Sequence, residues 1–299
     1  IGIRLQLGVV DPMVSVFYRF TVASLLLVLW CLLCRINMHF KLFDHVFMLM
    51  QGMLLFGFNY LLFYIAELHV TSGLAAVVFS TILVMNMING AIFLRTPIDG
   101  RVVVGGILGL AGIGLVFRPE ITSFSLENDG LRGVGYCLLA TFLASLGNII
   151  SARNQKHGLP VVQTNAYGMG YGAMVLGIIT VAMGKPFEFE YTLAYTGSLL
   201  YLAMFGSVIA FGCYLTLIGR IGAARAAYAT LLFPIVALLI STIFEGYRWS
   251  LSSSAGIVLI LAGNLWMLEK GAAGRVRLLL YRIPGLIRKP VSQEADQAT

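Results

Sequence analysis

The sequence predicts an all-α membrane protein of ten transmembrane helices, arranged as two inverted five-helix repeats, with the first helix truncated at the N-terminus. Three observations predict this fold class: an apolar composition, a regular series of long apolar segments, and an internal repeat. Hydrophobic residues make up 59% of the 299 residues, charged residues only 11%, and the mean hydropathy is +0.90. A soluble domain carries roughly 25% charged residues. The composition therefore fits a chain whose solvent is lipid.

Nine apolar segments are long enough to cross a bilayer or nearly so, and short polar breaks separate them. Residues 1–8 precede them and read as the last turns of a helix that begins upstream, which makes ten helices the natural number. The nine segments are Pro12–Cys34, His45–Glu67, Thr71–Leu94, Val102–Phe117, Gly133–Ala152, Val162–Met183, Ala194–Leu217, Ala223–Phe244 and Ser254–Leu268.

The basic residues of the polar breaks predict the orientation, because cytoplasmic loops carry an excess of Lys and Arg. Alternate breaks and the C-terminal tail hold Arg35, Lys41, Arg95, Arg101, Arg153, Lys156, Arg220, Arg225, Lys270, Arg275, Arg277, Arg282, Arg288 and Lys289. The other breaks hold only Arg118, Arg132, Lys185 and Arg248. We therefore expect a multi-pass protein of the bacterial inner (plasma) membrane with a cytoplasmic C-terminus. The formal net charge of +7 reflects this orientation rather than a surface for nucleic acid.

An internal repeat appears when the chain is shifted by 151 residues, which places His69–Leu115 on Arg220–Trp266 without a gap. In that register Gly105 falls on Gly256 and Gly112 on Gly263. Each copy has an odd number of helices, so the second copy is inverted, as in many secondary transporters. We expect a first repeat over 1–118, an external linker over 119–132, a second repeat over 133–270 and a basic cytoplasmic tail over 271–299.

Several motifs resemble the drug/metabolite transporter superfamily in its bacterial ten-helix, EamA-type branch. They are Arg19-Phe20, Tyr64-Ile-Ala-Glu-Leu with Thr71-Ser-Gly-Leu-Ala75, Gly105 to Gly112, Arg220-Ile-Gly-Ala-Ala-Arg-Ala-Ala-Tyr228, Pro234, and Gly256 to Gly263. The resemblance covers nearly the whole chain. It departs at Leu94-Arg95-Thr96-Pro97, where the family often has a Gly-Glu pair. It implies a ten-helix exporter of amino acids or related metabolites, in general character similar to the aromatic amino-acid exporters.

The sequence lacks the motifs of the other chemistries. There is no phosphate-binding loop of the G-x-x-x-x-G-K-[ST] type and no polar segment long enough for a nucleotide-binding domain. Gly168, Gly170 and Gly172 lie inside an apolar segment, where helix packing explains them. The four histidines have no metal-ligand spacing, and Cys31-x-x-Cys34, although it resembles a redox or zinc pair, lies in an apolar run with no partner pair. We expect no enzymatic activity, no cofactor, no metal and no nucleic-acid partner, while the oligomeric state stays open.

Polar and aromatic residues inside the apolar segments are the candidate substrate-binding residues. They are Arg19, Asn59, Phe63, Asn86, Asn89, Asn148, Tyr214 and Tyr228. The uncharged asparagines together with aromatic rings suit a neutral or zwitterionic, partly apolar solute, although each asparagine equally suits an interhelical hydrogen bond. Phe63 falls on Tyr214 under the repeat offset, so an aromatic residue occupies this position in both copies. Pro234 lies in mid-helix and is a candidate hinge.

Arg19 has two interpretations, because a charge at its depth must face the protein interior or a wet cavity. It could clamp a substrate carboxylate, or it could cap backbone carbonyls or pair with Asp11 or another outer acid. Carboxylates are absent from the middles of the apolar segments, which favours a facilitator or exchanger over a carboxylate-gated proton antiporter.

The predicted function is secondary transport: export of small metabolites, most of all amino acids, aromatic or otherwise apolar ones included, through a central cavity between the repeats by alternating access. The alternatives within this class are efflux of drugs or other metabolites and uptake of phosphorylated sugars. A membrane receptor or scaffold and an intramembrane enzyme are more distant alternatives, because the loops are short and no catalytic constellation is present.

Overall fold

The computed structural model describes residues 10–122, 128–232 and 250–281, and within these ranges the regular structure is entirely helical. The first half contains α1 (Pro12–Leu33), α2 (Leu42–Gln51), the π-helical segment η2 (Gly52–Phe58), α3 (Asn59–Ala66), α4 (Ser72–Ser80), α5 (Ile82–Leu94), α6 (Gly100–Val116) and α7 (Arg118–Thr122). The second half contains α8 (Asn128–Lys156), α9 (Val161–Ala182), α10 (Leu193–Ala203), the π-helical segment η3 (Met204–Ile209), α11 (Ala210–Ile221), α12 (Ala223–Ala226), α13 (Tyr228–Leu231) and α15 (Leu251–Tyr281).

Six continuous helical rods in the described ranges are long and apolar enough to cross a membrane. They are Pro12–Leu33, Leu42–Ala66, Gly73–Leu94, Gly130–Lys156, Val161–Ala182 and Leu193–Ile221, and two shorter apolar helices, Gly100–Val116 and Leu251–Met267, accompany them. These eight correspond to eight of the nine predicted segments. Only 223–232 of the remaining segment is described, so the predicted hinge Pro234 lies outside the described residues. The tail from 282 onward also lies outside them.

The helix ends follow from local capping residues. Asp11 accepts a hydrogen bond from the backbone N–H of Met13 at 2.8 Å, and Pro12 occupies the first helical position of α1. Thr71, Asp99 and Thr192 cap α4, α6 and α10 in the same manner. Two of the expected domain boundaries fall inside helices. The helix α8 begins at residue 128, inside the predicted linker, and α15 continues to residue 281, past the predicted start of the tail.

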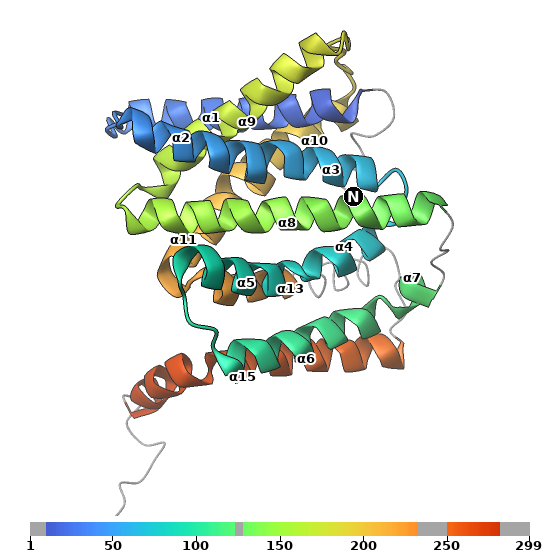
Figure 1. Ribbon diagram of the computed structural model, residues 1–299, viewed down its shortest axis with the longest axis vertical. Helices are drawn as coiled ribbons and strands as arrows, with labels where there is room; N and C mark the ends of the chain where they lie inside the picture. The colour runs from blue at the N-terminus through green and yellow to red at the C-terminus, as the bar shows by residue number, and fades with distance from the viewer. Residues whose placement is uncertain (1–9, 123–127, 233–249, 282–299) are drawn as a thin grey trace, which may run out of the picture.

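The helices lie side by side in one stack, with α1 and α9 at one edge, α8 across the middle and the pair α6 and α15 at the other edge (Figure 1). The pair α6–α15 packs through glycines. A Cβ atom built on Gly112 would lie 2.6 Å from the carbonyl oxygen of Gly256, and one on Gly263 would lie 2.8 Å from that of Gly105. Only glycine fits at such distances, so the two backbones are in direct contact.

Two of the long rods contain a π-helical turn in the middle. The segments η2 and η3 interrupt the rods Leu42–Ala66 and Leu193–Ile221, and the repeat offset of 151 residues places Met53–Phe58 on Met204–Ile209. A third rod is interrupted at Thr81, whose hydroxyl donates to the carbonyl of Val78 at 2.6 Å. Such back-bonding by Ser and Thr bends helices. Leu55 of η2, and Phe79 and Ile82 on either side of Thr81, line one of the cavities described below.

Candidate functional site

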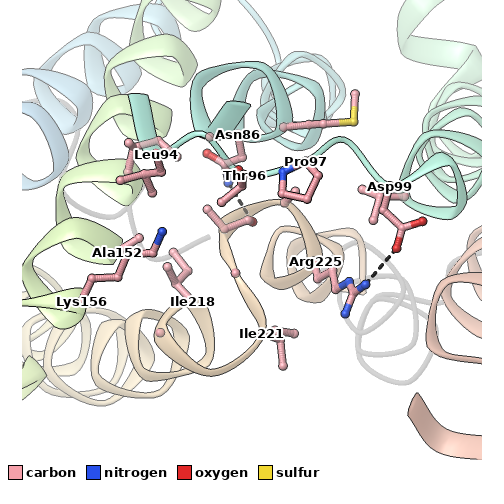
Figure 2. Close-up of a pocket in the computed structure, with 18 of the residues that line it drawn as sticks. Asn86, Leu94, Thr96, Pro97, Asp99, Ala152, Lys156, Ile218, Ile221 and Arg225 are labelled. Atoms are coloured by element: carbon pink, nitrogen blue, oxygen red, sulfur yellow. Dashed lines mark hydrogen bonds and ion pairs between the residues drawn. The ribbon is translucent and has the colours of Figure 1, made fainter. Parts of the chain in front are cut away.

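The larger cavity, here called the vestibule, opens beside the loop between α5 and α6 and has a volume of about 670 Å³ (Figure 2). Its walls come from α5, that loop, α8, α11 and α12. The lining residues are Asn86, Met87, Gly90, Leu94, Thr96, Pro97, Asp99, Val102, Ile149, Ala152, Gln155, Lys156, Ile218, Gly219, Ile221, Gly222, Ala223, Ala224 and Arg225. Charged and amide side chains sit at the loop end, so the vestibule is wet at its mouth.

An ion pair spans the mouth of the vestibule. One guanidinium nitrogen of Arg225 donates to Oδ2 of Asp99 at 2.8 Å, which joins α12 to the start of α6 (Figure 2). Asp99 also accepts a hydrogen bond from the backbone N–H of Arg101 at 3.0 Å. The Arg101 N–H and the Arg225 guanidinium hold the pKa of the Asp99 carboxyl below its usual value. The Asp99 carboxyl is therefore ionised throughout the physiological range of pH.

The smaller cavity, here called the aromatic cavity, has a volume of about 270 Å³ and lies between α3, α4, α8 and α11. Its lining contains five aromatic rings, two asparagines and the carboxylate-bearing Glu67. The lining residues are Leu55, Asn59, Tyr60, Phe63, Glu67, Ala75, Ala76, Phe79, Ile82, Ala144, Asn148, Phe211 and Tyr214. Phe63 and Phe79 pack edge to face at 5.4 Å between ring centroids, as do Tyr60 and Phe211 at 6.1 Å.

The two cavities follow each other along one axis. On α8 the aromatic cavity takes Ala144 and Asn148, and the vestibule takes residues from Ile149 to Lys156. On α11 the order is the same, with Phe211 and Tyr214 before the vestibule residues 218–221, and on α4–α5 residues 75–82 precede 86–94. Each helix therefore runs from the aromatic cavity toward the vestibule mouth. The two cavities therefore lie in succession along the helices, an arrangement here called the path.

A cluster of three side chains, Asn86, Asn148 and Tyr214, separates the cavities. The amide nitrogen of Asn148 donates long hydrogen bonds to Oδ1 of Asn86 and to the hydroxyl of Tyr214, each at 3.4 Å. The amide nitrogen of Asn86 donates to the backbone carbonyl of Ala223 at 3.2 Å. Asn86 lines the vestibule, whereas Asn148 and Tyr214 line the aromatic cavity. The partition is therefore one layer of hydrogen-bonded side chains thick.

The direction of these hydrogen bonds is fixed from one end. A backbone carbonyl can only accept, so Asn86 must turn its NH₂ group toward Ala223 and its Oδ1 toward Asn148. Asn148 presents its NH₂ group to Asn86, and its own Oδ1 is buried without a hydrogen-bond partner. A buried acceptor left unpaired is destabilising by about 1–3 kcal/mol. Oδ1 of Asn148 is thus a hydrogen-bond acceptor without a donor.

Arg19 lines neither cavity. Its side chain is buried, its Nε donates to the hydroxyl of Ser207 at 3.0 Å, and its Nη2 donates to the carbonyl of Gly206 at 3.3 Å, both in η3. The guanidinium carbon lies 4.6 Å from the centroid of the Tyr60 ring, which is a wall of the aromatic cavity. Nη1 has no hydrogen-bond partner. Arg19 therefore connects the π-helical turn of α10–α11 to the cavity wall.

Arg19 does not form an ion pair with Asp11 in the structure. Asp11 forms its ion pair with Nζ of Lys185 at 2.7 Å, which ties the start of α1 to the α9–α10 connection. Arg19 instead meets backbone and hydroxyl oxygens, which matches the carbonyl-capping interpretation of this residue.

The remaining predicted residues divide between cavity and packing positions. Asn59 lines the aromatic cavity, and its amide donates to the carbonyl of Ala140 at 3.3 Å. Asn89 lines neither cavity and donates to the hydroxyl of Ser145 at 2.9 Å. Tyr228 also lines neither, and its hydroxyl donates to the carbonyl of Val102 at 3.1 Å beside Gly105. Asn89 and Tyr228 thus have the contacts of interhelical hydrogen-bonding residues.

Some residues of the path carry too weak a sequence signal to be selected. Tyr60 belongs to the same helical stripe as Phe56 and Phe63, at spacings of four and three residues, and that periodicity could have identified it. Asp99 and Arg225 are loop charges in the sequence, and only the fold brings them together. No cluster of three or more potential metal ligands occurs within residues 10–122, 128–232 and 250–281.

Comparisons with known proteins agree with this architecture. Residues 1–118 and 131–268 match the EamA-like transporter family. An uncharacterized transporter of Archaeoglobus fulgidus is 25% identical over 278 residues, which are 90% of this chain and 93% of that protein. A probable amino-acid metabolite efflux pump of Salmonella typhimurium is 24% identical over 70% of this chain and 71% of its own. One solved structure superimposes with a TM-score of 0.73 at 15% identity and covers 93% of this chain and 96% of its own.

Proposed function

The chain belongs to the EamA-like transporter family, and we propose from this premise that it is a secondary transporter that exports amino acids with apolar or aromatic side chains. It lies as a multi-pass protein in the bacterial inner membrane, with its C-terminus and the vestibule facing the cytoplasm. The excess of Lys and Arg in the polar breaks on that side, Arg95, Lys156 and Arg225 among them, supports this orientation. A C-terminal alkaline-phosphatase fusion should be inactive, because its phosphatase would stay in the cytoplasm and not reach the periplasm.

The observation that carries the proposal is the interrupted path. A wet vestibule and an aromatic cavity meet at a partition of three side chains, Asn86, Asn148 and Tyr214. A carrier that works by alternating access needs a substrate site that two barriers open in turn. Asn148 can separate from Asn86 and Tyr214 with the loss of two long hydrogen bonds. The partition is thin enough to be such a barrier.

Internal symmetry supports two inverted five-helix repeats. Gly105 corresponds to Gly256 and Gly112 to Gly263 in the repeat, and the observed contacts are Gly105 with Gly263 and Gly112 with Gly256. This exchange is what a two-fold axis between α6 and α15 requires. The segments η2 and η3 occur at equivalent positions, and the equivalent helices α1 and α9 pack together. Alternating access would then exchange the conformations of the two copies.

The size and chemistry of the aromatic cavity support an amino-acid-sized substrate. A volume of about 270 Å³ lies just below the range of roughly 300–1,000 Å³ for drug-sized ligands. Five rings with two amides suit an apolar body that carries a few polar groups. The alternative is efflux of drugs or other metabolites. The relative from Salmonella typhimurium is named as a probable amino-acid metabolite efflux pump, and that name supports amino acids as the substrate class over drugs.

Counterflow in proteoliposomes tests the proposal. Vesicles loaded with one unlabelled amino acid should take up the same labelled amino acid transiently, and a panel should rank phenylalanine, tyrosine, leucine and valine above glutamate and lysine. Ala76→Trp should abolish uptake because the indole fills the aromatic cavity. Leu200→Trp is the matched control, since Leu200 is exposed on α10 and lines neither cavity.

Three results would count against the proposal. They are absence of counterflow for every amino acid with folded protein, equal uptake by wild type and Ala76→Trp, or uptake of cationic drugs alone.

A further inference from the structure

We infer that the aromatic cavity recognises its ligand through a primary ammonium group, which donates to Oδ1 of Asn148 while the surrounding rings hold an apolar body. The inference rests on the proposed function for the identity of the solute, but it concerns which end of that solute the protein binds. Four features of the described residues carry it: an unpaired acceptor, a fixed amide orientation, an aromatic wall and the charge of the lining.

The acceptor comes first. Oδ1 of Asn148 is buried with no hydrogen-bond partner, and Asn148 itself is fully buried. Its orientation follows from the hydrogen bonds of the neighbouring Asn86. Ala223 fixes Asn86 through a carbonyl that can only accept, and Asn86 fixes Asn148. A ligand group that satisfies this atom must be a donor, so an ammonium fits and a carboxylate does not.

The wall is suited to a cation. Tyr60, Phe63, Phe79, Phe211 and Tyr214 line the same cavity as Asn148. The faces of such rings attract an ammonium group within about 6 Å, most strongly where water is excluded. The cavity lining contains no Lys or Arg, and its one charged residue, Glu67, is acidic. The lining therefore has several groups that favour an ammonium and no cationic side chain that would form an ion pair with a carboxylate.

The competing hypothesis is that Arg19 binds the carboxylate of the ligand. Its guanidinium lies against the Tyr60 ring but lines neither cavity, and two of its nitrogens already donate to Ser207 and Gly206 of η3. Its Nη1 has no hydrogen-bond partner and is the donor that a substrate carboxylate would use in this hypothesis. Recognition by Arg19 and recognition by Asn148 therefore predict opposite preferences between a ligand without its carboxylate and a ligand without its ammonium.

Binding to the purified full-length protein distinguishes the two. Isothermal titration calorimetry would compare L-phenylalanine with 2-phenylethylamine, which lacks the carboxylate, and 3-phenylpropionate, which lacks the ammonium. We expect 2-phenylethylamine to bind within a few-fold of phenylalanine. We expect 3-phenylpropionate to bind about tenfold or more weakly, the factor that corresponds to one hydrogen bond from a charged group. The reverse order would overturn the inference, as would failure of all three ligands to bind.

Variants add a second, independent readout. Asn148→Leu should weaken 2-phenylethylamine about tenfold or more and leave 3-phenylpropionate unchanged. Thr141→Val is the matched control on the same helix, because Thr141 is buried, donates to its own helix at Cys137 and lines neither cavity. It should bind like wild type. Unchanged amine binding in a folded Asn148→Leu protein would contradict the inference.

Transport and binding separate the inference from the proposed function. If 2-phenylethylamine binds through Asn148 but no amino acid exchanges in counterflow, the proposed function fails and the inference stands. If amino acids exchange but 3-phenylpropionate competes with them and 2-phenylethylamine does not, the proposed function stands and the inference fails.

Discussion

Phe63 and Tyr214 occupy the same position in the two repeats, and both line the aromatic cavity. Aromatic contacts contribute about 0.5–1.5 kcal/mol beyond their area, so Phe63→Ala and Tyr214→Ala should each raise the KM for phenylalanine roughly two- to tenfold in reconstituted vesicles. Tyr214→Phe keeps the ring and should have the smaller effect on KM. Phe93→Ala is the control, because Phe93 is 62% exposed on α5. Wild-type kinetics in both alanine variants would show that the rings serve packing alone.

The ion pair Asp99–Arg225 makes a prediction about pH. Because the folded-state pKa of Asp99 is lowered, the pair is present above the ordinary carboxyl pKa and is lost only as the pH falls through the lowered value. Transport between roughly pH 5 and 8 should therefore show the same pH profile in wild type and Asp99→Asn. The absolute rate of the variant can differ, since the vestibule mouth loses one contact between α6 and α12. A titration step present only in wild type within that window would contradict the assignment.

At the residue scale the sequence identified the cavity residues only in part. Asn59, Phe63, Asn148 and Tyr214 line the aromatic cavity, and Asn86 lines the vestibule, because helical stripes of polar and aromatic residues mark faces that avoid lipid. The same stripes contain Asn89, whose partner is Ser145 on the neighbouring helix. An asparagine that joins two helices and one that faces a cavity look alike in sequence. Their assignment to binding stays a prediction until ligands are measured.

At the element scale the glycines of α6 and α15 test the packing. A Cβ atom on Gly112 would lie 2.6 Å from the Gly256 carbonyl oxygen and 3.0 Å from the backbone nitrogen of Ile260, so Gly112→Ala must push the two helices apart. We expect a loss of about 1–3 kcal/mol in stability, measured as a lower melting temperature in detergent. Gly114→Ala on the same helix meets no atom within 4 Å and should be neutral or slightly stabilising. Equal melting of the two variants would refute the close contact.

The π-helical turns show where sequence patterns stop being informative. The rods Leu42–Ala66 and Leu193–Ile221 read as continuous apolar helices, and one added residue in a turn leaves no composition signal. Their causes are tertiary. Gly52 in η2 approaches the backbone of Gly168 and Gly172, and η3 supplies the carbonyl that Arg19 binds. Apolar length thus predicts the helices, whereas their internal irregularities depend on neighbours far away in the chain.

At the scale of the whole molecule, the apolar segments and the repeat offset each correspond to features of the structure. The apolar segments predicted helices, and the described ranges contain them. The repeat offset of 151 residues relates the glycines of the two α6–α15 contacts to each other, and it relates η2 to η3. The orientation in the membrane is predicted from the charge bias of the polar breaks. Which cavity faces which compartment is therefore the property that most needs a direct measurement.

Chemical labelling of introduced cysteines measures which compartment each cavity faces. In a background without the native Cys31, Cys34, Cys137 and Cys213, Ala224→Cys lies in the vestibule and Ala76→Cys in the aromatic cavity, on opposite sides of the partition. A membrane-impermeant maleimide should label Ala224→Cys in inverted vesicles and not in right-side-out ones, because the partition stops the reagent at Asn86, Asn148 and Tyr214. Phenylalanine at saturating concentration should lower labelling of Ala76→Cys from the periplasmic side, because the substrate occupies the aromatic cavity that Ala76 lines. Labelling of both cysteines from the same compartment, with or without substrate, would mean that the cavities are not two ends of a transport path.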